Sequence, residues 1–259
     1  MSVVVAVRDK DQIWLATDSQ VTSGWTKRLL TSQHSFKIFK KPHGINIGGV
    51  GSLRDLNIIS TSDVELISEN DILKGNINFK NIVRETVPKL FAELDAFDRL
   101  YKDKGMREMN SAFIIAHGET CFLIDMDGSV IELVDMLATG SGGDISESAY
   151  AVLRDTNLTP KEKAIRAVAV SCEKDLFVGY PIVVTSTKMD NFEVFDGENF
   201  FSISEEGELV LMDYVDGIET YDDDGEDIEE EVDEEKECRC EECHCKKDVH
   251  IEKVDKKVK

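Results

Sequence analysis

The sequence predicts a layered α/β fold, a four-layer αββα sandwich with two antiparallel sheets between pairs of helices. Strand-like and helix-like segments alternate in groups along the chain, in the order strands, two helices, strands, two helices, strands, which suits antiparallel sheets with helices outside. The 259 residues are 41% hydrophobic, which is enough for a sizeable core. The composition changes near residue 212, so we expect a folded domain over residues 1–212 and a separate tail over residues 213–259.

The chain begins with strands. Residues 2–8 are rich in β-branched side chains and predict a buried strand, which the polar turn DKDQ joins to a second strand over residues 13–19. After a polar stretch, residues 35–41 and 45–51 predict another strand pair around the turn KPHG. The second strand of this pair is rich in glycine, which allows close approach of the backbone.

Helical patterns follow this strand pair. Residues 52–66 are broadly helical, and residues 78–105 carry apolar side chains at helical spacing. Pro88 predicts a kink or break in the second of these helices, and Gly105 predicts its end. Residues 111–134 then predict three short strands, separated by HGE and by a DG turn.

A second helix pair follows these strands. Residues 140–156 start with glycines and become helical. The next helix begins with Thr159 before a proline and has Glu162 three residues later, the spacing of a capping box, and we expect it to end near Gly179. The chain then returns to strand character over residues 181–188 and 192–196.

The charge and the cysteines exclude several protein classes. A formal net charge of −22 repels phosphate backbones, so we expect no nucleic-acid partner. The sequence contains neither an apolar run of about 18 residues that predicts a membrane span nor the pattern of a secretory signal. Four of the six cysteines crowd into residues 238–245, and Cys121 and Cys172 stand alone. This pattern is typical of a reducing compartment, so we expect a cytoplasmic protein.

Three blocks of sequence carry a resemblance to a known family. They are SVVVAVRDKDQIWLATDSQVTSG, KIFKKPHGINIGGVGS and ATGSGGDISESAYAVLRDTNLTPKEKAIRAVAVSCEKDLFVG, in that order. The chain resembles the β-type subunits of the proteasome and, more closely, the HslV peptidases, which are N-terminal-nucleophile (Ntn) hydrolases. The resemblance covers roughly residues 2–195. It implies the Ntn-hydrolase sandwich and peptide-bond hydrolysis of the threonine type.

The resemblance also implies an active site. Ser2 takes the place of the family's N-terminal threonine and becomes the nucleophile once Met1 is removed. The other catalytic positions of the family fall on Asp18, Lys37, Gly51, Ser141 and Asp175. Its substrate-binding positions fall on Gly49, Ser19 and Thr22. Val178 stands where the family has a serine, so one hydroxyl of the supporting network is missing.

Each implied role has a chemical reason. A serine hydroxyl needs a base nearby, and the freed α-amine of Ser2, with an ordinary pKa of about 7.7–8.0, can serve. Lys37, fixed by Asp18, holds positive charge beside this amine and lowers its pKa. The N–H of Gly51 faces the oxyanion of the transition state, a contact worth roughly 3–4 kcal/mol in other hydrolases. A glycine at position 49 leaves room for a large apolar substrate side chain, unless neighbouring side chains fill that room.

Taken singly, these residues have structural interpretations as well. Ser2 is also an ordinary strand start, Lys37 alternates with apolar neighbours as an outward-facing strand lysine would, and Asp18 suits a turn. The GSGG motif suits a flexible helix entry. Their occurrence together, in the order of the family, favours the active site.

The tail carries two features that the resemblance does not cover. The segment ECRCEECHC has a C-x-C-x2-C-x-C spacing that suits zinc or another soft metal, or else belongs to a flexible reduced tail. The candidate ligands are Cys238, Cys240, Cys243 and Cys245. From Asp213 to Glu235 every charged residue is acidic, which predicts a disordered, solvated spacer, a docking segment for a basic partner, or a charge that limits access to a chamber. The tail ends in a Lys-rich stretch over residues 246–259.

The resemblance implies a homo-oligomeric ring, an ATP-dependent unfoldase that feeds it, and unfolded proteins or peptides as substrates. Catalysis in the family requires no cofactor. Two alternatives stay open. One is a catalytically inactive structural, assembly or regulatory protein on the same fold, which a retained Met1 would favour because it blocks the amine. The other is an amidase for a small substrate, which a monomeric state would favour.

Overall fold

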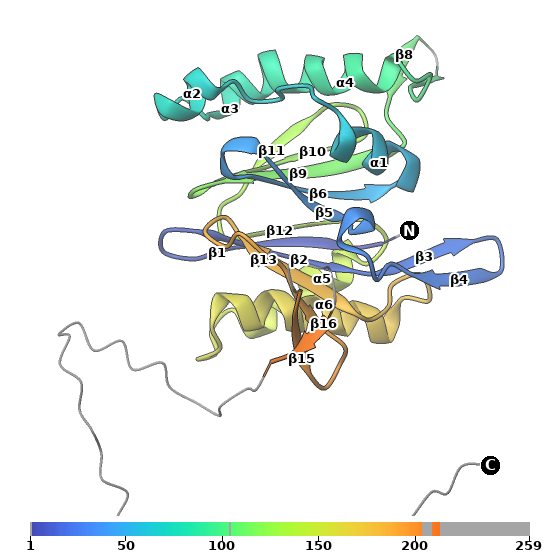
Figure 1. Cartoon of the computed structure of the whole chain (residues 1–259), viewed down its shortest axis with the longest axis vertical. Coiled ribbons are helices and arrows are strands. Elements are labelled where there is room, and N and C mark those ends of the chain that lie inside the picture. Colours follow the sequence, from blue (N-terminus) through green and yellow to red (C-terminus); the bar gives the residue numbers. More distant parts are fainter. Residues whose placement is uncertain (1, 104, 204–208, 213–259) are drawn as a thin grey trace, which may run out of the picture. The chain divides into compact units, whose positions relative to one another are not determined.

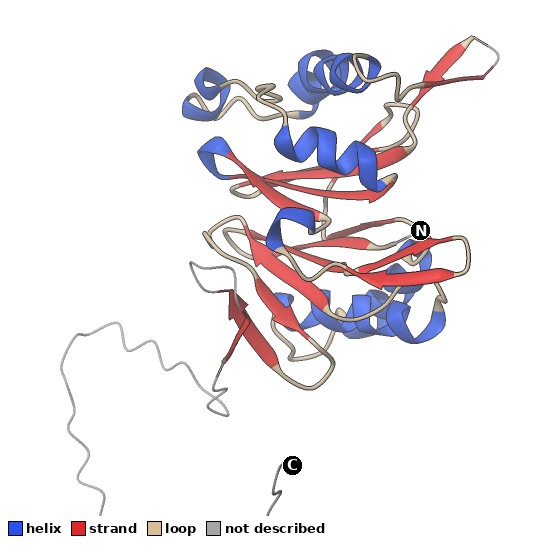
Figure 2. Cartoon of the chain, turned by 45° about the vertical axis from the view of Figure 1, so that its right-hand side comes forward, coloured by secondary structure: helices blue, strands red, loops and turns tan. Residues whose placement is uncertain are grey.

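Two antiparallel sheets lie face to face at the centre of the domain, and helices cover the outer face of each sheet (Figure 1, Figure 2). The structure, a computed structural model, describes residues 2–103, 105–203 and 209–212. The predicted four-layer αββα arrangement is confirmed. None of the helices in these ranges has the length and apolar character needed to cross a lipid bilayer.

The helices form the two outer layers. Those on the outer face of the second sheet are α1 (Leu53–Thr61), α2 (Glu69–Leu73), α3 (Phe79–Asn81) and α4 (Val87–Asp95). Those on the outer face of the first sheet are α5 (Gly143–Leu153) and α6 (Pro160–Lys174). The capping box predicted for α6 is confirmed. The Thr159 hydroxyl accepts the Glu162 N–H at 3.2 Å, and the Thr159 N–H donates to Glu162 Oε2 at 2.8 Å.

The first sheet has seven strands in the order β12-β1-β2-β13-β14-β15-β16. They are β1 (Val4–Arg8), β2 (Ile13–Asp18), β12 (Met136–Thr139), β13 (Ile182–Ser186), β14 (Glu193–Phe195), β15 (Phe200–Ile203) and β16 (Leu209–Leu211). Alternate side chains of β1 face opposite sides of the sheet: Val5 and Val7 pack with α6, whereas Val4 and Ala6 pack with the second sheet. Because both faces are buried, this strand is apolar from Val4 to Val7, as its composition predicted.

The second sheet has five strands in the order β11-β10-β9-β6-β5. They are β5 (Ile38–Lys41), β6 (Ile45–Gly51), β9 (Ser111–His117), β10 (Thr120–Ile124) and β11 (Val130–Glu132). On its outer face, Ile47 and Phe113 pack with Leu56 of α1 and with Leu90 and Leu94 of α4. This packing fixes α1 directly after β6, where the candidate site lies.

The long helix expected over residues 78–105 is wrong in its second half. The helix ends at Asp95, and the chain turns at Asp98, whose φ is 53°. A hairpin then follows, formed by β7 (Tyr101–Asp103) and β8 (Met106–Glu108). Gly105 lies in its turn with a φ of 87°, so this glycine serves the hairpin and does not end a helix. The irregularity expected at Pro88 is present, because the π-helical segment Ile82–Thr86 directly precedes α4.

Other element boundaries also differ from the sequence prediction. The helix expected over residues 52–66 ends at Thr61, and α6 ends at Lys174, before Gly179. The polar stretch after Ser19 forms a hairpin that the pattern did not predict, because most of its side chains are exposed. Its strands are β3 (Gln20–Ser23) and β4 (Thr26–Leu29). The short strands β12, β15 and β16 were missed as well.

Candidate active site

A buried ion pair joins the end of β2 to the residue before β5. Lys37 Nζ lies 2.7 Å from Asp18 Oδ1, and the two side chains are 3% and 0% exposed. The same ammonium donates to the carbonyl of Gln20 at 2.6 Å. Burial lowers the pKa of Lys37 and raises the pKa of Asp18, and the charge of each partner counters the shift of the other. Lys37 is therefore not the outward-facing strand lysine of the structural interpretation.

Backbone amides surround the Asp18 carboxylate. The Val3 N–H donates to Oδ1 at 3.0 Å, and the N–H groups of Gln20 and Gly179 donate to Oδ2 at 3.1 and 3.3 Å. These donors stabilise the carboxylate in a place where water does not reach it. Through them Asp18 ties the N-terminal strand to the β3 strand and to the segment before β13.

A cavity of about 270 Å³ opens beside this ion pair. It brings together four of the residues that the sequence singled out: Ser2, Thr22, Lys37 and Gly51. Its other lining residues are Val21, Val50, Ser52, Leu53 and Leu56. Ser2 is 5% exposed, so the cavity is the face on which a substrate could approach this residue.

Gly51 ends β6 with a φ of +108°. A Cβ at this position would lie 2.2 Å from the Asn110 carbonyl oxygen, so only glycine fits. The Gly49 N–H donates to the Lys37 carbonyl at 2.8 Å, on the β5 side of the strand. Since N–H groups two residues apart point to the same side of a strand, the Gly51 N–H points past the start of β5, to the side where the cavity lies.

Known proteins are similar to this chain in sequence and in fold. No protein-family profile matches the sequence. The ATP-dependent protease subunit HslV of Caldicellulosiruptor saccharolyticus is 27% identical over 186 residues, which cover 71% of this chain and 96% of the relative. Thiobacillus denitrificans BPH, solved in complex with epoxomicin, has a TM-score of 0.57 at 20% identity, covering 71% of this chain and 97% of that one. Eukaryotic HslV from Trypanosoma brucei has a TM-score of 0.52 at 24% identity, covering 71% of this chain and 98% of that one.

The chain is similar to the HslV protease subunits in sequence and to HslV and BPH in fold. The similar structures confirm the predicted Ntn-hydrolase fold.

Two further predicted residues of the HslV-like chain, Ser141 and Asp175, do not line the cavity. The Ser141 hydroxyl donates to the Ser2 carbonyl at 3.5 Å, and the Gly142 N–H donates to the same carbonyl at 3.3 Å. Asp175 lies in the turn after α6, where its Oδ1 accepts the Phe177 N–H at 2.9 Å. Its Oδ2 is buried and has no hydrogen-bond partner in the described part of the chain.

The three predicted substrate-binding residues have different positions. Thr22 lines the cavity, and its hydroxyl accepts a hydrogen bond from Gln20 Nε2 at 3.1 Å. Ser19 is 1% exposed and lies outside the lining. Gly49 also lies outside it, because a Cβ at this position would be 2.9 Å from Leu56 Cγ. The space beside Gly49 is thus filled by Leu56, a lining residue that sequence reasoning missed.

Gln20 is a second residue that sequence reasoning missed. Its N–H binds Asp18 and its carbonyl binds Lys37. Its side-chain amide donates to the Leu176 carbonyl at 2.8 Å and to Thr22 Oγ1. One signal for Gln20 was present in the sequence, a large polar residue two positions after an aspartate at a strand end. The two contacts of its backbone do not depend on the side chain, so the sequence does not indicate them.

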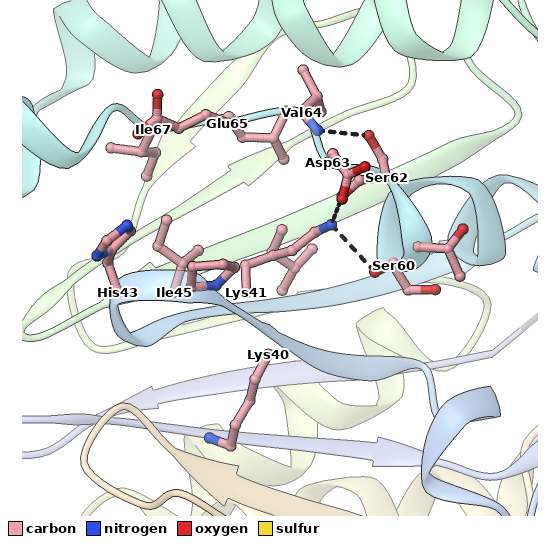
Figure 3. Close-up of a pocket in the computed structure, with 14 residues that line it drawn as sticks. Lys40, Lys41, His43, Ile45, Ser60, Ser62, Asp63, Val64, Glu65 and Ile67 are labelled. Carbon is pink, nitrogen blue, oxygen red and sulfur yellow. Dashed lines mark hydrogen bonds between the residues drawn. The ribbon is translucent and has the colours of Figure 1, made fainter.

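A larger cavity, of about 460 Å³, lies between the β5–β6 turn and the segment after α1 (Figure 3). Its lining contains none of the predicted site residues. Lys41 Nζ donates to the carbonyls of Ser60 and Ser62 there, so its ammonium caps the C-terminal end of α1. Lys40 points the other way and donates to Asn46 Oδ1 at 2.7 Å. Both lysines therefore have structural partners.

The predicted metal ligands of the HslV-like chain, Cys238, Cys240, Cys243 and Cys245, lie outside the described residues, as does the acidic segment. In the described ranges, no group of three or more His, Cys, Asp or Glu side chains could hold a metal ion.

Proposed function

We propose that this chain is a peptidase that cleaves peptide bonds with Ser2 as its N-terminal nucleophile, after removal of Met1. The observation that carries the proposal is the buried Asp18–Lys37 pair, which lies beside the cavity that Ser2 and Gly51 line. Burial removes the hydration of a lysine ammonium, and this cost in free energy is offset only where the ammonium has a counter-ion and hydrogen-bond acceptors. Buried charged groups of this kind are candidates for catalytic residues. The relative named ATP-dependent protease subunit HslV supports peptide bonds as the substrate class.

The proposed reaction has two halves. The α-amine of Ser2 takes the proton of the Ser2 hydroxyl while the oxygen attacks the peptide carbonyl carbon, and the Gly51 N–H donates to the resulting oxyanion. The amine then passes the proton to the leaving nitrogen as the C–N bond breaks. An acyl-enzyme remains, and water hydrolyses it with the same amine as base. The ammonium of Lys37 lowers the pKa of the amine, so that it is neutral near pH 7.

The remaining predicted residues support this reaction without forming or breaking bonds, and among them Thr22 lines the cavity. In the proposal, Ser141 steadies Ser2 through its carbonyl, and Asp175 steadies the turn before Gly179, whose N–H binds Asp18. Thr22 and Leu56 form the wall against which a substrate side chain packs. Ser19 and Gly49 shape this wall from behind.

The proposal extends to the assembly. Because the relative is named as a subunit of an ATP-dependent protease, we propose a cytoplasmic, homo-oligomeric ring that takes unfolded proteins from an ATP-dependent unfoldase. In this proposal the domain spans residues 1–212, and residues 213–259 form a tail whose cysteines bind zinc.

The test is intact-mass analysis after exposure to a peptide vinyl sulfone, a β-lactone or epoxomicin. We expect a protein without Met1 that gains one adduct, mapped to Ser2, together with hydrolysis of unfolded casein. Ser2→Ala should lose the adduct and the activity, and Ser2→Thr, the matched control, should keep both.

Two results would overturn the proposal. One is a Met1-free ring that forms no adduct at high inhibitor concentration in the presence of its ATPase. The other is an adduct and activity that persist in Ser2→Ala.

A further inference from the structure

A closed ring of hydrogen bonds lies directly behind the Gly51 turn. The Ser52 N–H donates to Ser111 Oγ at 3.0 Å, and the Ser111 hydroxyl donates to Asp55 Oδ2 at 3.0 Å. Arg99 closes the ring, because its Nε donates to Asp55 Oδ1 at 2.6 Å and its Nη2 donates to Ser52 Oγ at 2.9 Å. The four side chains come from the β6–α1 turn, α1, the segment after α4 and the start of β9.

The ring acts on the segment that forms one wall of the Ser2 cavity. Gly51 pairs with Ser111 across the β6–β9 ladder, and Ser52 follows it immediately. A Cβ at Gly51 would lie 3.0 Å from Ser111 Oγ, so the ring and the glycine are in close contact. Ser52 and Leu53 line the cavity themselves. The Ser52–Ser111 hydrogen bond fixes the peptide group that follows Gly51. Because this group joins the Gly51 Cα, it also limits the rotation of the peptide group before it, which carries the Gly51 N–H.

The charges of the ring are balanced. The Asp55 side chain is 0% exposed, and an unpaired carboxylate in such a place would repel negative charge that develops near the start of α1. Arg99 cancels this charge and uses its planar fork to bridge Asp55 and Ser52 at once, which a lysine cannot do. Because Arg99 balances the charge of Asp55, the electrostatic potential at the N-terminal end of α1 stays positive and favours an anion.

We propose that the Ser52–Asp55–Arg99–Ser111 ring is a positioning device for the Gly51 N–H, so that its four members control how well the tetrahedral intermediate is stabilised. The inference rests on the proposed function, since it concerns the oxyanion of that reaction. Ser111 and Arg99 are positioning residues, because neither lines the cavity.

The test compares Ser111→Ala with Thr86→Val in the full chain. Thr86 is the matched control, since its buried hydroxyl donates to the Leu66 carbonyl at 3.1 Å in the same helical layer, away from the Ser2 cavity. We expect Ser111→Ala to lower kcat about tenfold with KM changed less than twofold, because a displaced donor weakens transition-state contacts and leaves ground-state binding. Affinity for a peptide boronate, which forms a tetrahedral anion on Ser2, should fall in parallel. Arg99→Lys, which keeps the charge and loses the fork, should give an intermediate loss.

A second readout is independent of activity. Amide hydrogen exchange in the peptide spanning residues 49–56 should be faster in Ser111→Ala than in Thr86→Val by about tenfold. Equal exchange in the two variants, or equal losses of kcat and boronate affinity, overturns the inference. If the unaltered chain forms no Ser2 adduct, the proposed function fails, while the exchange data still decide whether the ring orders the turn.

Discussion

Two buried ion pairs flank the candidate site, and they differ in the cation that each uses. Lys37 pairs with Asp18 at 2.7 Å and is 3% exposed, whereas Arg99 pairs with Asp55 at 2.6 Å and is 21% exposed. The lysine is a compact charge whose pKa falls on burial. The arginine is a planar fork that stays charged and bridges two groups. Lys37, which can lose its charge, thus lines the cavity. Arg99, which stays charged, holds the cavity wall through Ser52.

The largest expected difference between the pairs is in activity. Lys37→Met should lower kcat by about 1000-fold or more, because the base and the transition state lose the nearby positive charge. Lys40→Met is the matched control, as Lys40 lies on β5 and binds Asn46 and Met189 away from the cavity. Its kcat should stay within threefold of the unaltered chain. Comparable losses of kcat in Lys37→Met and Lys40→Met would contradict a special role for the charge of Lys37.

The next largest difference is in stability. Asp55→Asn should lower the free energy of unfolding by roughly 3 kcal/mol, because Arg99 keeps its charge and loses its counter-ion in a mostly buried place. Asp95→Asn breaks the exposed pair with Arg107, at 2.9 Å, and should cost about 1 kcal/mol or less. Urea denaturation measures both. A cost for Asp55→Asn no larger than that of the surface control contradicts the assigned role.

The pH dependence of kcat should separate the two pairs by whether the alkaline limb of the profile moves. Burial lowers the pKa of Lys37, so activity should decline on the alkaline side at a pH below 10.5. The charge of Asp18 raises the pKa of Lys37, so Asp18→Asn should lower it further and move the alkaline limb to lower pH. Asp55→Asn should leave the limb in place. A shift to higher pH in Asp18→Asn would contradict this account.

The smallest effect concerns Cys172, whose thiol senses the first pair. Burial, and then Asp18, raise the pKa of Cys172 to about 12, so native alkylation at pH 8.5 should be far slower than in the unfolded chain. Asp18→Asn should speed this reaction severalfold, and Asp55→Asn should not change it. Mass spectrometry of the alkylated peptide gives the rates. Equal rates in the two variants would mean that the thiol does not sense Asp18.

The sequence predicted the first pair and missed the second for a physical reason. Asp18 and Lys37 end or precede strands whose apolar patterns are clear, and the order of the family supplied their partnership. Asp55 and Arg99 are 44 positions apart, and the helix pattern between them gave the wrong end point for α4. Gly49 shows the same limit, since the room beside a glycine depends on how Leu56 packs from α1. Local hydrophobic periodicity predicts the helices and strands that form the layers. It does not predict which side chains fill the space between two layers, because that depends on how the layers pack.

The ribosome synthesises the N-terminal residues of this protein long before the segments that bind them in the folded chain. The Ser2 carbonyl accepts hydrogen bonds from Ser141 and Gly142, and a Cβ on Gly140 would lie 2.2 Å from the same oxygen. The Asp18 carboxylate accepts the N–H of Gly179. At 5–20 residues per second, residue 179 follows residue 2 by roughly 10–35 s. During this time the N-terminal end is open to an aminopeptidase, whereas Ser2 is 5% exposed in the folded chain. If Ser2 is the nucleophile, as proposed, we therefore expect Met1 to be removed from the nascent chain.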